Sequence, residues 1–342
     1  MGINTSFIGC DMAVDLGTTN TLVYVWSQGI VLNEPSVVAI NAITGDIMAV
    51  GAEARKAIGR EPGNAVVVRP LKNGVIADFE VAERMLRYFI LKVHKRRWVA
   101  RPRLLVCVPS DITGIERRAF IEASTQAGAR QVHVISEPMA AAIGAGLPVH
   151  EATGNMVVNI GGGTTQVAVI SFGEIVNEKS IRVGGDELDE TIIQHVKKEY
   201  SLLLGESTAE HIKVTIGSVS HSQEDKRIEI YGRDLISGLP NAADVSAAGI
   251  RRAMEQPVSA MINVVQDILS DCSPELSGDI ISNGITLTGG GSLLHGLDTR
   301  LHHETGIPFK IADNPMSSAA FGAGRCVEKF GMLQILTSRR HR

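Results

Sequence analysis

The sequence predicts an α/β protein in which mostly parallel sheets are covered by helices. Short apolar runs of strand length alternate with amphipathic helical patterns along most of the 342 residues. Aromatic residues make up only 4% of the chain whereas glycines number 35, a composition that favours tight turns between strands and helices over an all-β sandwich. At roughly 150 residues per domain, the length predicts two domains.

The first expected elements are two strands, at residues 14–16 and 21–26, which flank a tight turn. A helix is expected to begin at Asp78, because an aspartate can accept hydrogen bonds from the free amides of a first helical turn. The apolar positions that follow at helical spacing define its buried face: Val81, Met85, Phe89 and Val93.

A continuous apolar run at residues 104–108, ended by Pro109, predicts a buried strand. Thr113 and Glu116 form a capping box at the start of the next helix. Its apolar stripe is expected at Ile115, Ala119 and Ala123, and its end at Gly128. Further strands are expected at residues 132–135, 156–160, 166–170 and Ile285–Thr288.

One segment of the chain is repeated. The sequence VDLGTTNTLVYV, beginning at Val14, aligns with VNIGGGTTQVAV, beginning at Val158, if one added glycine is allowed. Each copy is a strand, a turn of glycine and threonine, and a returning strand. A common hairpin pattern could produce this match by chance, but the shared order of residues favours a duplicated fold with two similar lobes.

Composition and charge exclude several classes of protein. Lys and Arg number 33 against 37 Asp and Glu, and a net charge of −4 makes a whole-surface nucleic-acid partner improbable on electrostatic grounds. No run of eighteen apolar residues spans a bilayer. The 4 cysteines form no CxxC pair, and the N-terminus lacks the charged and apolar regions of a signal peptide, so a reducing, cytoplasmic location is expected.

Three glycine clusters could bind phosphates or a nucleoside. A turn of glycine and threonine exposes backbone N–H groups and adds hydroxyl donors. Two such turns occupy the duplicated hairpins, where they could grip a polyphosphate from both sides of a cleft, and the third cluster follows the strand Ile285–Thr288. Each cluster alone is more often an ordinary turn, and neither a P-loop nor a GxGxxG fingerprint is present. The candidate residues are Gly17, Thr18, Thr19 and Asn20, then Gly161, Gly162, Gly163 and Thr164, and finally Gly289, Gly290 and Gly291.

A basic segment interrupts this mildly acidic chain. Residues 84–103 contain eight Lys and Arg and no acid. Basic residues beside exposed Trp and Val suit an anionic lipid surface, where each charge contributes about 1 kcal/mol. The alternative is a solvated basic turn with the indole folded into the core. The candidate membrane residues are Lys95, Arg96, Arg97, Trp98 and Val99, with a second contact from Phe7 and Ile8.

Several segments together are similar to one family. They read DLGTTNTLVYV, IVLNEPSVVAI, LKNGVIADFEVAERMLRYFI, EPMAAAIGAGLPV, NIGGGTTQVAVIS, GGDELDETI and TLTGGGSLLHGLDTRL. These segments strongly resemble MreB/Mbl-type bacterial actins, from about the tenth residue to the last helix. The resemblance implies a duplicated actin-like (ribonuclease H-like) fold, with four subdomains around a nucleotide cleft between two lobes. It implies ATP and Mg²⁺ as cofactors and slow ATP hydrolysis coupled to polymerisation.

The resemblance also implies subdomain boundaries. The first lobe would have a core formed by residues 1–32, 75–150 and 320–342, with a small subdomain at 33–74. The second would have a core formed by 151–184 and 245–319, with a small subdomain at 185–244.

Roles for individual residues follow from the resemblance. Asp15 would lie near the magnesium ion, directly or through water, and Glu137 would orient the attacking water with help from Thr164. Glu210 and Lys213 would reach the ribose and adenine. The glycine turns would hold the phosphates and, at Gly289 to Gly291, close the nucleoside side. Gly184 and Gly185 belong to the same set of cleft turns.

Two departures from the family pattern concern hydrolysis. Family members usually have aspartate where this chain has Asn159, the duplicate of Asp15, and glutamate where it has Gln166. An amide keeps an acceptor oxygen but lacks the charge that helps to hold magnesium. ATP binding is therefore expected, with hydrolysis slower than in relatives that have aspartate. A nucleotide-binding scaffold without hydrolysis stays open as an alternative, and a small-molecule kinase of the same superfold is a weaker one.

The resemblance further implies partners and location. The chain would polymerise with itself, or with a paralogue, on the inner face of the cytoplasmic membrane. It would organise cell-wall synthesis and cell shape together with membrane proteins of the wall machinery. MreB-type proteins insert an apolar loop at a position that matches Trp98 and Val99, which favours the membrane interpretation of the basic segment.

Overall fold

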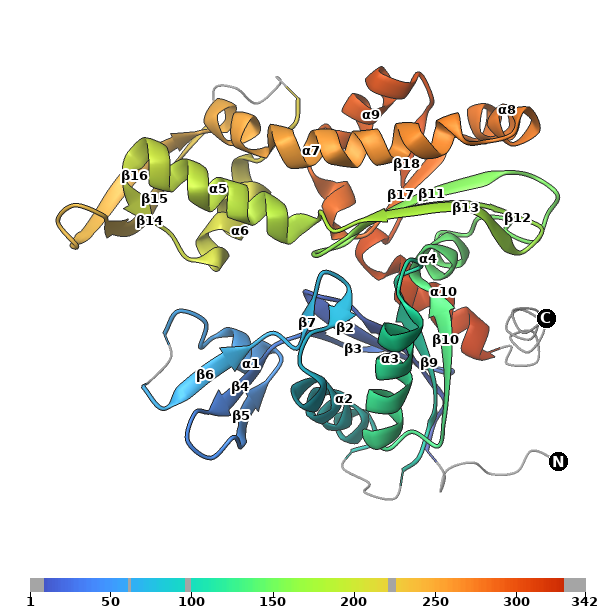
Figure 1. Ribbon diagram of the computed structural model, residues 1–342, viewed down its shortest axis with the longest axis horizontal. Helices are drawn as coiled ribbons and strands as arrows, with labels where there is room; N and C mark the ends of the chain where they lie inside the picture. The colour runs from blue at the N-terminus through green and yellow to red at the C-terminus, as the bar shows by residue number, and fades with distance from the viewer. Residues whose placement is uncertain (1–8, 61–62, 96–99, 221–225, 329–342) are drawn as a thin grey trace.

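The protein has two lobes, each built around a five-stranded sheet. The computed structural model describes residues 9–60, 63–95, 100–220 and 226–328. The first lobe contains β1 to β10, and the second begins at β11, as Figure 1 shows. The last helix, α10 (Ser318–Glu328), returns to the first lobe, where it packs against β1 and β2. No helix in the described ranges is both long and apolar enough to cross a membrane.

The sheet of the first lobe has the order β10-β9-β1-β2-β3. Strands β10, β9 and β1 run parallel, whereas β1, β2 and β3 form antiparallel hairpins. Helices α2 (Phe79–Val93) and α3 (Gly114–Gln126) cover one face, and α4 (Glu137–Gly144) and α10 cover the other. The strands are β1 (Met12–Leu16), β2 (Asn20–Val25), β3 (Gly29–Pro35), β9 (Arg103–Val108) and β10 (Gln131–Ser136).

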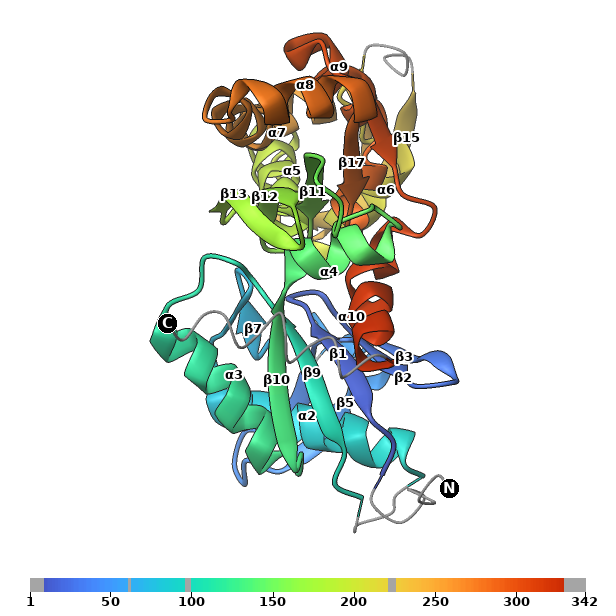
Figure 2. The ribbon, with the colours of Figure 1, turned by 90° about the vertical axis from the view of Figure 1, so that its right-hand side faces the viewer.

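The second lobe repeats this topology. Its sheet has the order β13-β12-β11-β17-β18, with the same antiparallel hairpins and the same parallel pairs. One face packs against α5 (Gly185–Tyr200) and α7 (Ala247–Ser270), and the other against α4, which lies between the two sheets (Figure 2). The strands are β11 (Asn155–Ile160), β12 (Thr165–Ser171), β13 (Glu174–Ile181), β17 (Ile285–Thr288) and β18 (Phe309–Ile311).

The expected duplication is confirmed, and no added glycine is needed. In the first hairpin the amide of Gly17 donates to the carbonyl of Asn20 at 3.1 Å, and in the second Gly161 donates to Thr164 at 2.8 Å. The two turns therefore have equal lengths. The expectation of mostly parallel sheets is wrong, because each sheet combines two parallel pairs with two antiparallel pairs. Tight turns connect neighbouring strands antiparallel, which leaves only the crossover connections parallel.

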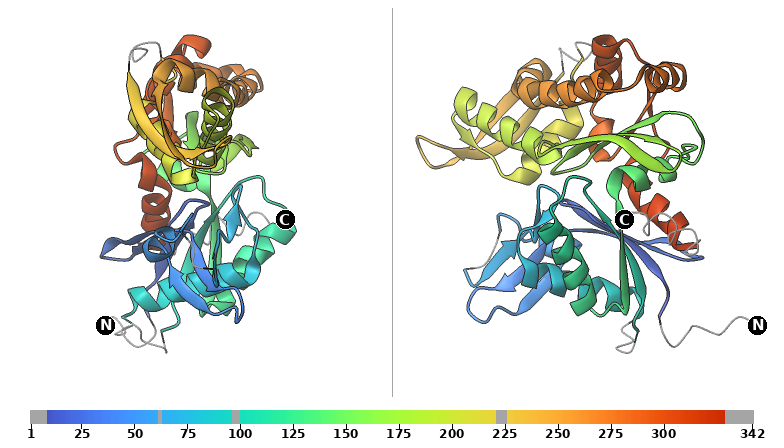
Figure 3. Two further views of the ribbon diagram at one scale, coloured as in Figure 1. Left: turned by 90° about the vertical axis from the view of Figure 1, so that its left-hand side faces the viewer. Right: turned by 45° about the vertical axis from the view of Figure 1, so that its right-hand side comes forward.

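Each lobe also has a small sheet on the same side of the molecule, as Figure 3 shows. In the first lobe it contains β5 (Ile47–Val50), β4 (Val38–Asn41) and β6 (Ala65–Val68), next to α1 (Ala52–Arg55). In the second lobe it contains β14 (Leu202–Leu203), β15 (Arg227–Asp234) and β16 (Pro240–Ser246), next to α5 (Gly185–Tyr200) and α6 (Glu206–Ile216). The remaining elements are β7 (Leu71–Lys72), β8 (Val75–Ile76), α7 (Ala247–Ser270), α8 (Pro274–Asn283), η3 (Gly290–Leu293), α9 (Leu297–Thr305) and η4 (Pro315–Ser317).

Both predicted helix caps are present. The carboxylate of Asp78 accepts a hydrogen bond from the amide of Val81 at 3.0 Å, and the face expected for α2 is buried except at its end, where Val93 is half-buried. Thr113 and Glu116 form the reciprocal capping box of α3. The local sequence therefore determines where these helices begin.

The apolar stripe expected for α3 is partly wrong. Ile115 is 83% exposed, and the residues that α3 buries are Phe120, Ala123 and Ser124. At 3.6 residues per turn, Ile115 and Phe120 lie on different faces of the helix. The core accepts the larger Phe120, since its burial removes more apolar area from water, and this orientation turns Ile115 toward solvent.

Helix α4, which lies between the two sheets, crosses α10 closely. A Cβ atom added at Gly144 would lie 1.8 Å from the carbonyl oxygen of Ser318, and one at Gly322 would lie 1.8 Å from that of Ala140. The two helix backbones are therefore in direct contact at these glycines.

Candidate functional site

The two duplicated turns lie against each other at the boundary between the lobes. A Cβ atom added at Gly162 would lie 1.9 Å from Oγ1 of Thr19, and one at Gly163 would lie 2.8 Å from Oγ1 of Thr18. At Gly163 the added atom would also lie 2.9 Å from the backbone of Asn73, so a side chain there would push the lobes apart. The sequence analysis expects the two turns to face each other across a cleft, and in the structure they face each other in direct contact.

Neighbouring backbone segments hold both turns in place. The Thr18 hydroxyl accepts a hydrogen bond from the amide of Gly74 at 2.9 Å. In the second lobe, the amides of Gly185 and Asp186 donate to the carbonyls of Gly161 and Gly162 at 3.0 and 2.8 Å. The start of α5, just after Gly184, is thereby attached to the second turn, so the predicted glycine pair 184–185 belongs to the same site.

Two acids lie near the turns, the half-buried Asp15 and the buried Glu137. Asp15 is the penultimate residue of β1 and Asn159 the penultimate residue of β11, so the structure places them at equivalent positions. Glu137 is the first residue of α4 and is only 8% exposed. Burial raises the pKa of Asp15 to about 6. Burial, and then the charge of Asp15, raises the pKa of Glu137 to about 8, against a hydrogen bond from Gln166 that lowers it.

These raised pKa values predict a stability that falls as pH rises. The Glu137 carboxyl, facing Asp15 and Asp111, holds its proton in the native state up to about pH 8, whereas the unfolded chain releases it near 4.5. Between these values the native state binds more protons, so the free energy of unfolding decreases with increasing pH. Glu137→Gln removes the titratable group and with it this loss of stability. The exchange should stabilise the nucleotide-free protein by on the order of 2 kcal/mol at pH 8.

Urea unfolding of both proteins between pH 5 and pH 8 measures this difference. The advantage of Glu137→Gln should be small at pH 5 and largest at pH 8. A constant difference across this range would contradict the burial of an ionisable group at Glu137.

The third glycine cluster packs on the second sheet. A Cβ atom added at Gly289 would lie 2.2 Å from the carbonyl oxygen of Ile160, and one at Gly291 would lie 2.2 Å from Cγ2 of the same residue. Gly289 also has a φ of +80°. Packing on β11 therefore explains glycine at 289 and 291. At Gly290 an added Cβ would make only an ordinary contact, at 3.9 Å from Cγ of Met316.

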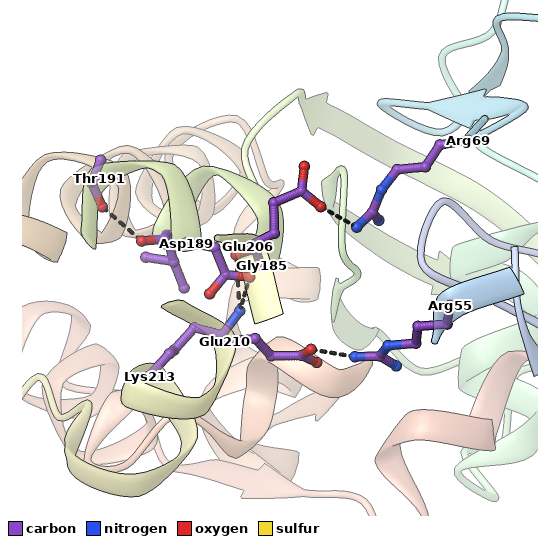
Figure 4. A network of polar contacts seen from close by, with 9 residues as sticks. Arg55, Arg69, Gly185, Asp189, Thr191, Glu206, Glu210 and Lys213 are labelled. Atoms are coloured by element: carbon purple, nitrogen blue, oxygen red, sulfur yellow. Dashed lines mark hydrogen bonds and ion pairs between the residues drawn. The ribbon is translucent and has the colours of Figure 1, made fainter. Parts of the chain in front are cut away.

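Glu210 and Lys213 lie on the same helix, α6, but have different partners (Figure 4). The Lys213 ammonium donates to the carbonyl of Gly185 at 2.9 Å and to the carboxylate of Asp189 at 2.8 Å. Burial raises the pKa of Asp189 to about 6, and Lys213 opposes this shift. Glu210 instead accepts a hydrogen bond from Arg55, which comes from α1 in the other lobe.

A second ion pair crosses between the lobes beside the first. Arg69, just after β6, pairs with Glu206 on α6, as Figure 4 shows. Glu206 and Glu210 are four residues apart and so share one face of the helix. Neither arginine was predicted from the sequence, because their partners lie 137 and 155 residues away along the chain. The two pairs, Arg55–Glu210 and Arg69–Glu206, are called the cross-lobe ion pairs below.

The site has the donor set for a polyphosphate with a cation. Two turns expose backbone N–H groups and hydroxyls, and a cation beside Asp15 would offset the cost of burying its charge. The buried Oδ1 of Asn20 also accepts no hydrogen bond from the described residues. Within the described ranges, no three His, Cys, Asp or Glu side chains are grouped to hold a metal ion. A magnesium ion would therefore take most of its ligands from phosphate oxygens and waters, as this ion prefers.

The predicted membrane residues lie mostly outside the described residues. This applies to Phe7, Ile8, Arg96, Arg97, Trp98 and Val99. Lys95 is exposed and has a φ of +51°, at the turn that follows α2 in the first lobe. It does not contact the turns or acids described above.

Comparison with known proteins gives a consistent result. The family described as MreB/Mbl protein matches residues 9–335. The cell shape-determining protein MreB of Escherichia coli K12 is 50% identical over 327 residues, covering 94% of each chain. The cell shape-determining protein Mbl of Bacillus subtilis is 46% identical over 323 residues, covering 94% of this chain and 97% of its own.

Solved structures agree with the sequence comparison. MreB5 of Spiroplasma citri bound to AMPPNP superimposes with a TM-score of 0.90 at 36% identity, covering 96% of this chain and 99% of its own. A MamK double helical filament has the same fold, with a TM-score of 0.78 at 22% identity over 93% of this chain and 99% of its own. The chain therefore belongs to the MreB/Mbl family of actin-like, cell shape-determining proteins.

Proposed function

We propose that this chain binds ATP with Mg²⁺ between its lobes and polymerises into filaments that determine cell shape. The observation that carries the proposal is the pair of duplicated glycine turns held against each other above Asp15 and Glu137. It is supported by a relative of 36% identity whose structure contains AMPPNP. The fold shared with a MamK filament supports polymerisation of the chain with itself.

The residues would act mainly by position and charge. The turns at Gly17 to Asn20 and Gly161 to Thr164 would hold the phosphates, and Asp15, with the amide of Asn159, would hold Mg²⁺ through its waters. Magnesium would supply charge neutralisation for phosphoryl transfer. Glu137, with Thr164, would orient the attacking water. Lys213 is on α6, but its ammonium group lies at the start of α5, beside Gly185, where it could also reach a nucleoside.

Glu210 has a competing partner in this scheme. Its carboxylate is paired with Arg55, so a contact between Glu210 and the ribose would have to share or replace that ion pair. We further propose that the small sheets mark two small subdomains, at residues 33–74 and 185–244, whose cross-lobe ion pairs close the mouth of the cleft.

We also propose that the filaments bind a membrane. The chain would lie on the inner face of the cytoplasmic membrane through its basic segment at residues 84–103 and would act with membrane proteins of wall synthesis. Its support is the cluster of eight basic residues without an acid. Sedimentation with anionic liposomes should be reduced by Trp98→Asp and Val99→Asp, and unchanged sedimentation would assign membrane contact to another surface.

Light scattering with and without ATP tests the central proposal. ATP and Mg²⁺ should raise the scattering of the purified chain, and electron microscopy of the pellet should show filaments. ATP turnover without assembly would instead favour a small-molecule kinase. No binding of ATP would overturn the proposal altogether.

A non-hydrolysing scaffold is the second candidate, and Asn159 is the observation that favours it. The Asn159 side chain lies at the position equivalent to Asp15 and accepts a hydrogen bond from the Thr288 hydroxyl at 3.1 Å. An amide there removes one negative charge from the proposed magnesium site. Phosphate release should be faster in Asn159→Asp than in the wild type. Equal rates would remove Asn159 as a reason to expect weak hydrolysis.

A further inference from the structure

Gln166 is a buried polar residue in the middle of an apolar strand. It lies in β12 and its side chain is 0% exposed. Buried polar groups are normally hydrogen-bonded, and both ends of this amide are used. Its Nε2 donates to Oε2 of Glu137 and, at 3.3 Å, to Oγ1 of Thr164, while its Oε1 accepts from the backbone amide of Ser110 at 3.2 Å.

The side-chain amide satisfies all of these partners at once. Glutamate, which family members usually have here, could keep the Ser110 hydrogen bond and accept one from the protonated Glu137 carboxyl group. A hydrocarbon side chain would leave a buried amide and a buried carboxylate without partners, each at a cost. The backbone amide of Ser110 donates to Oε1 of Gln166 and so fixes which way the side-chain amide points. In the reversed orientation, Oε1 would lie against the Glu137 carboxyl group.

These hydrogen bonds join the two lobes at the base of the site. Gln166 and Thr164 belong to the second lobe, whereas Glu137 begins α4 and Ser110 follows β9 in the first. The Glu137 oxygen Oε2 is occupied by Gln166. Its other oxygen, Oε1, accepts no hydrogen bond from the residues that the structure describes, and so is the oxygen that remains for a water.

We propose that Gln166 is a positioning residue for ATP hydrolysis, which holds the Glu137 carboxylate and the Thr164 hydroxyl in one fixed arrangement through its side-chain amide. This inference rests on the proposed function, because Gln166 acts only through the two residues that would orient the water. Catalytic groups lose efficiency steeply when they are misplaced by about 1 Å. Gln166 fixes the rotamer of Glu137 from the opposite lobe, so the arrangement forms only when the lobes are docked.

A double-mutant cycle tests the proposal. Single-turnover ATP hydrolysis and the ATP dissociation constant would be measured for Gln166→Met and Gln166→Leu, each alone and combined with Glu137→Ala. Each single exchange at Gln166 should slow hydrolysis roughly tenfold or more, with the dissociation constant changed less than about threefold. When combined with Glu137→Ala, the same exchanges should slow hydrolysis by less than about twofold relative to Glu137→Ala alone.

Gln194→Leu is the matched control. Gln194 on α5 is exposed and donates to Oε1 of Glu190 at 2.6 Å. The exchange therefore removes the same kind of Gln–Glu hydrogen bond, but outside the proposed site. This variant's hydrolysis rate should equal that of the wild type. Using both Gln166→Met and Gln166→Leu keeps the test informative if one of them does not fold.

The outcomes separate this inference from the proposed function. If Glu137→Ala slows hydrolysis but exchanges at Gln166 do not, only the inference is overturned. Equal slowing by the Gln166 exchanges in both backgrounds would also overturn it, because Gln166 would then act independently of Glu137. If the wild type binds ATP without hydrolysing it, or if Glu137→Ala has no effect, the hydrolytic part of the proposed function fails and the inference with it.

Discussion

Replacing Gly322 by alanine should lower the free energy of unfolding by about 3 kcal/mol. An added Cβ would lie 1.8 Å from the carbonyl oxygen of Ala140 and 2.7 Å from the amide of Gly144. These are backbone atoms within α4, which cannot move aside as the end of a flexible side chain could. The helices α4 and α10 would have to separate, although alanine itself favours a helix by about 1 kcal/mol over glycine.

Gly278→Ala provides the matched control, and urea unfolding provides the measurement. Gly278 also lies within a helix, α8, but no atom lies within 4 Å of an added Cβ. The exchange there should stabilise the protein by about 0.5–1 kcal/mol. Equal effects at Gly322 and Gly278 would show that the close crossing of α4 and α10 does not exist in solution.

Reversing the charge of both arginines in the cross-lobe ion pairs should speed nucleotide release roughly tenfold at low salt. Arg55 and Arg69 join the small sheet of the first lobe to α6 in the second. Exposed ion pairs each contribute only about 0.2–1 kcal/mol. Arg55→Glu with Arg69→Glu, however, converts two attractions into two repulsions, and both act directly against closure of the lobes.

Stopped-flow release of a fluorescent ATP analogue measures this effect. Adding Glu206→Arg and Glu210→Arg to the reversed chain should restore slow release, and high salt should reduce the difference between variants. Lys56→Glu is the control, since Lys56 lies beside Arg55 but pairs within α1, with Glu53 at 2.8 Å. Release that is equally fast in Lys56→Glu would attribute the effect to net charge and would contradict the role of the pairs.

The sequence by itself determined the parts of this protein that depend on neighbouring residues. The cap at Asp78 and the capping box at Thr113 and Glu116 operate within three positions, and both are present. The duplicated hairpins were recognisable because each one is a continuous segment whose strand and turn residues occur in the same order. Family membership followed from seven such continuous segments.

Tertiary structure alone decided which distant residues meet. The Gln166 amide contacts a carboxylate 29 positions away, and Arg55 pairs with a glutamate 155 positions away. The sequence marked Gln166 only as a departure from the family pattern, without its contacts, and it marked Arg55 not at all. The apolar pattern of α3 predicted Ile115 as a core residue, yet the sheet below it accepts Phe120. Local rules link residues through one turn of backbone, whereas these contacts depend on how two lobes and their helices dock, which is set by packing over the whole chain.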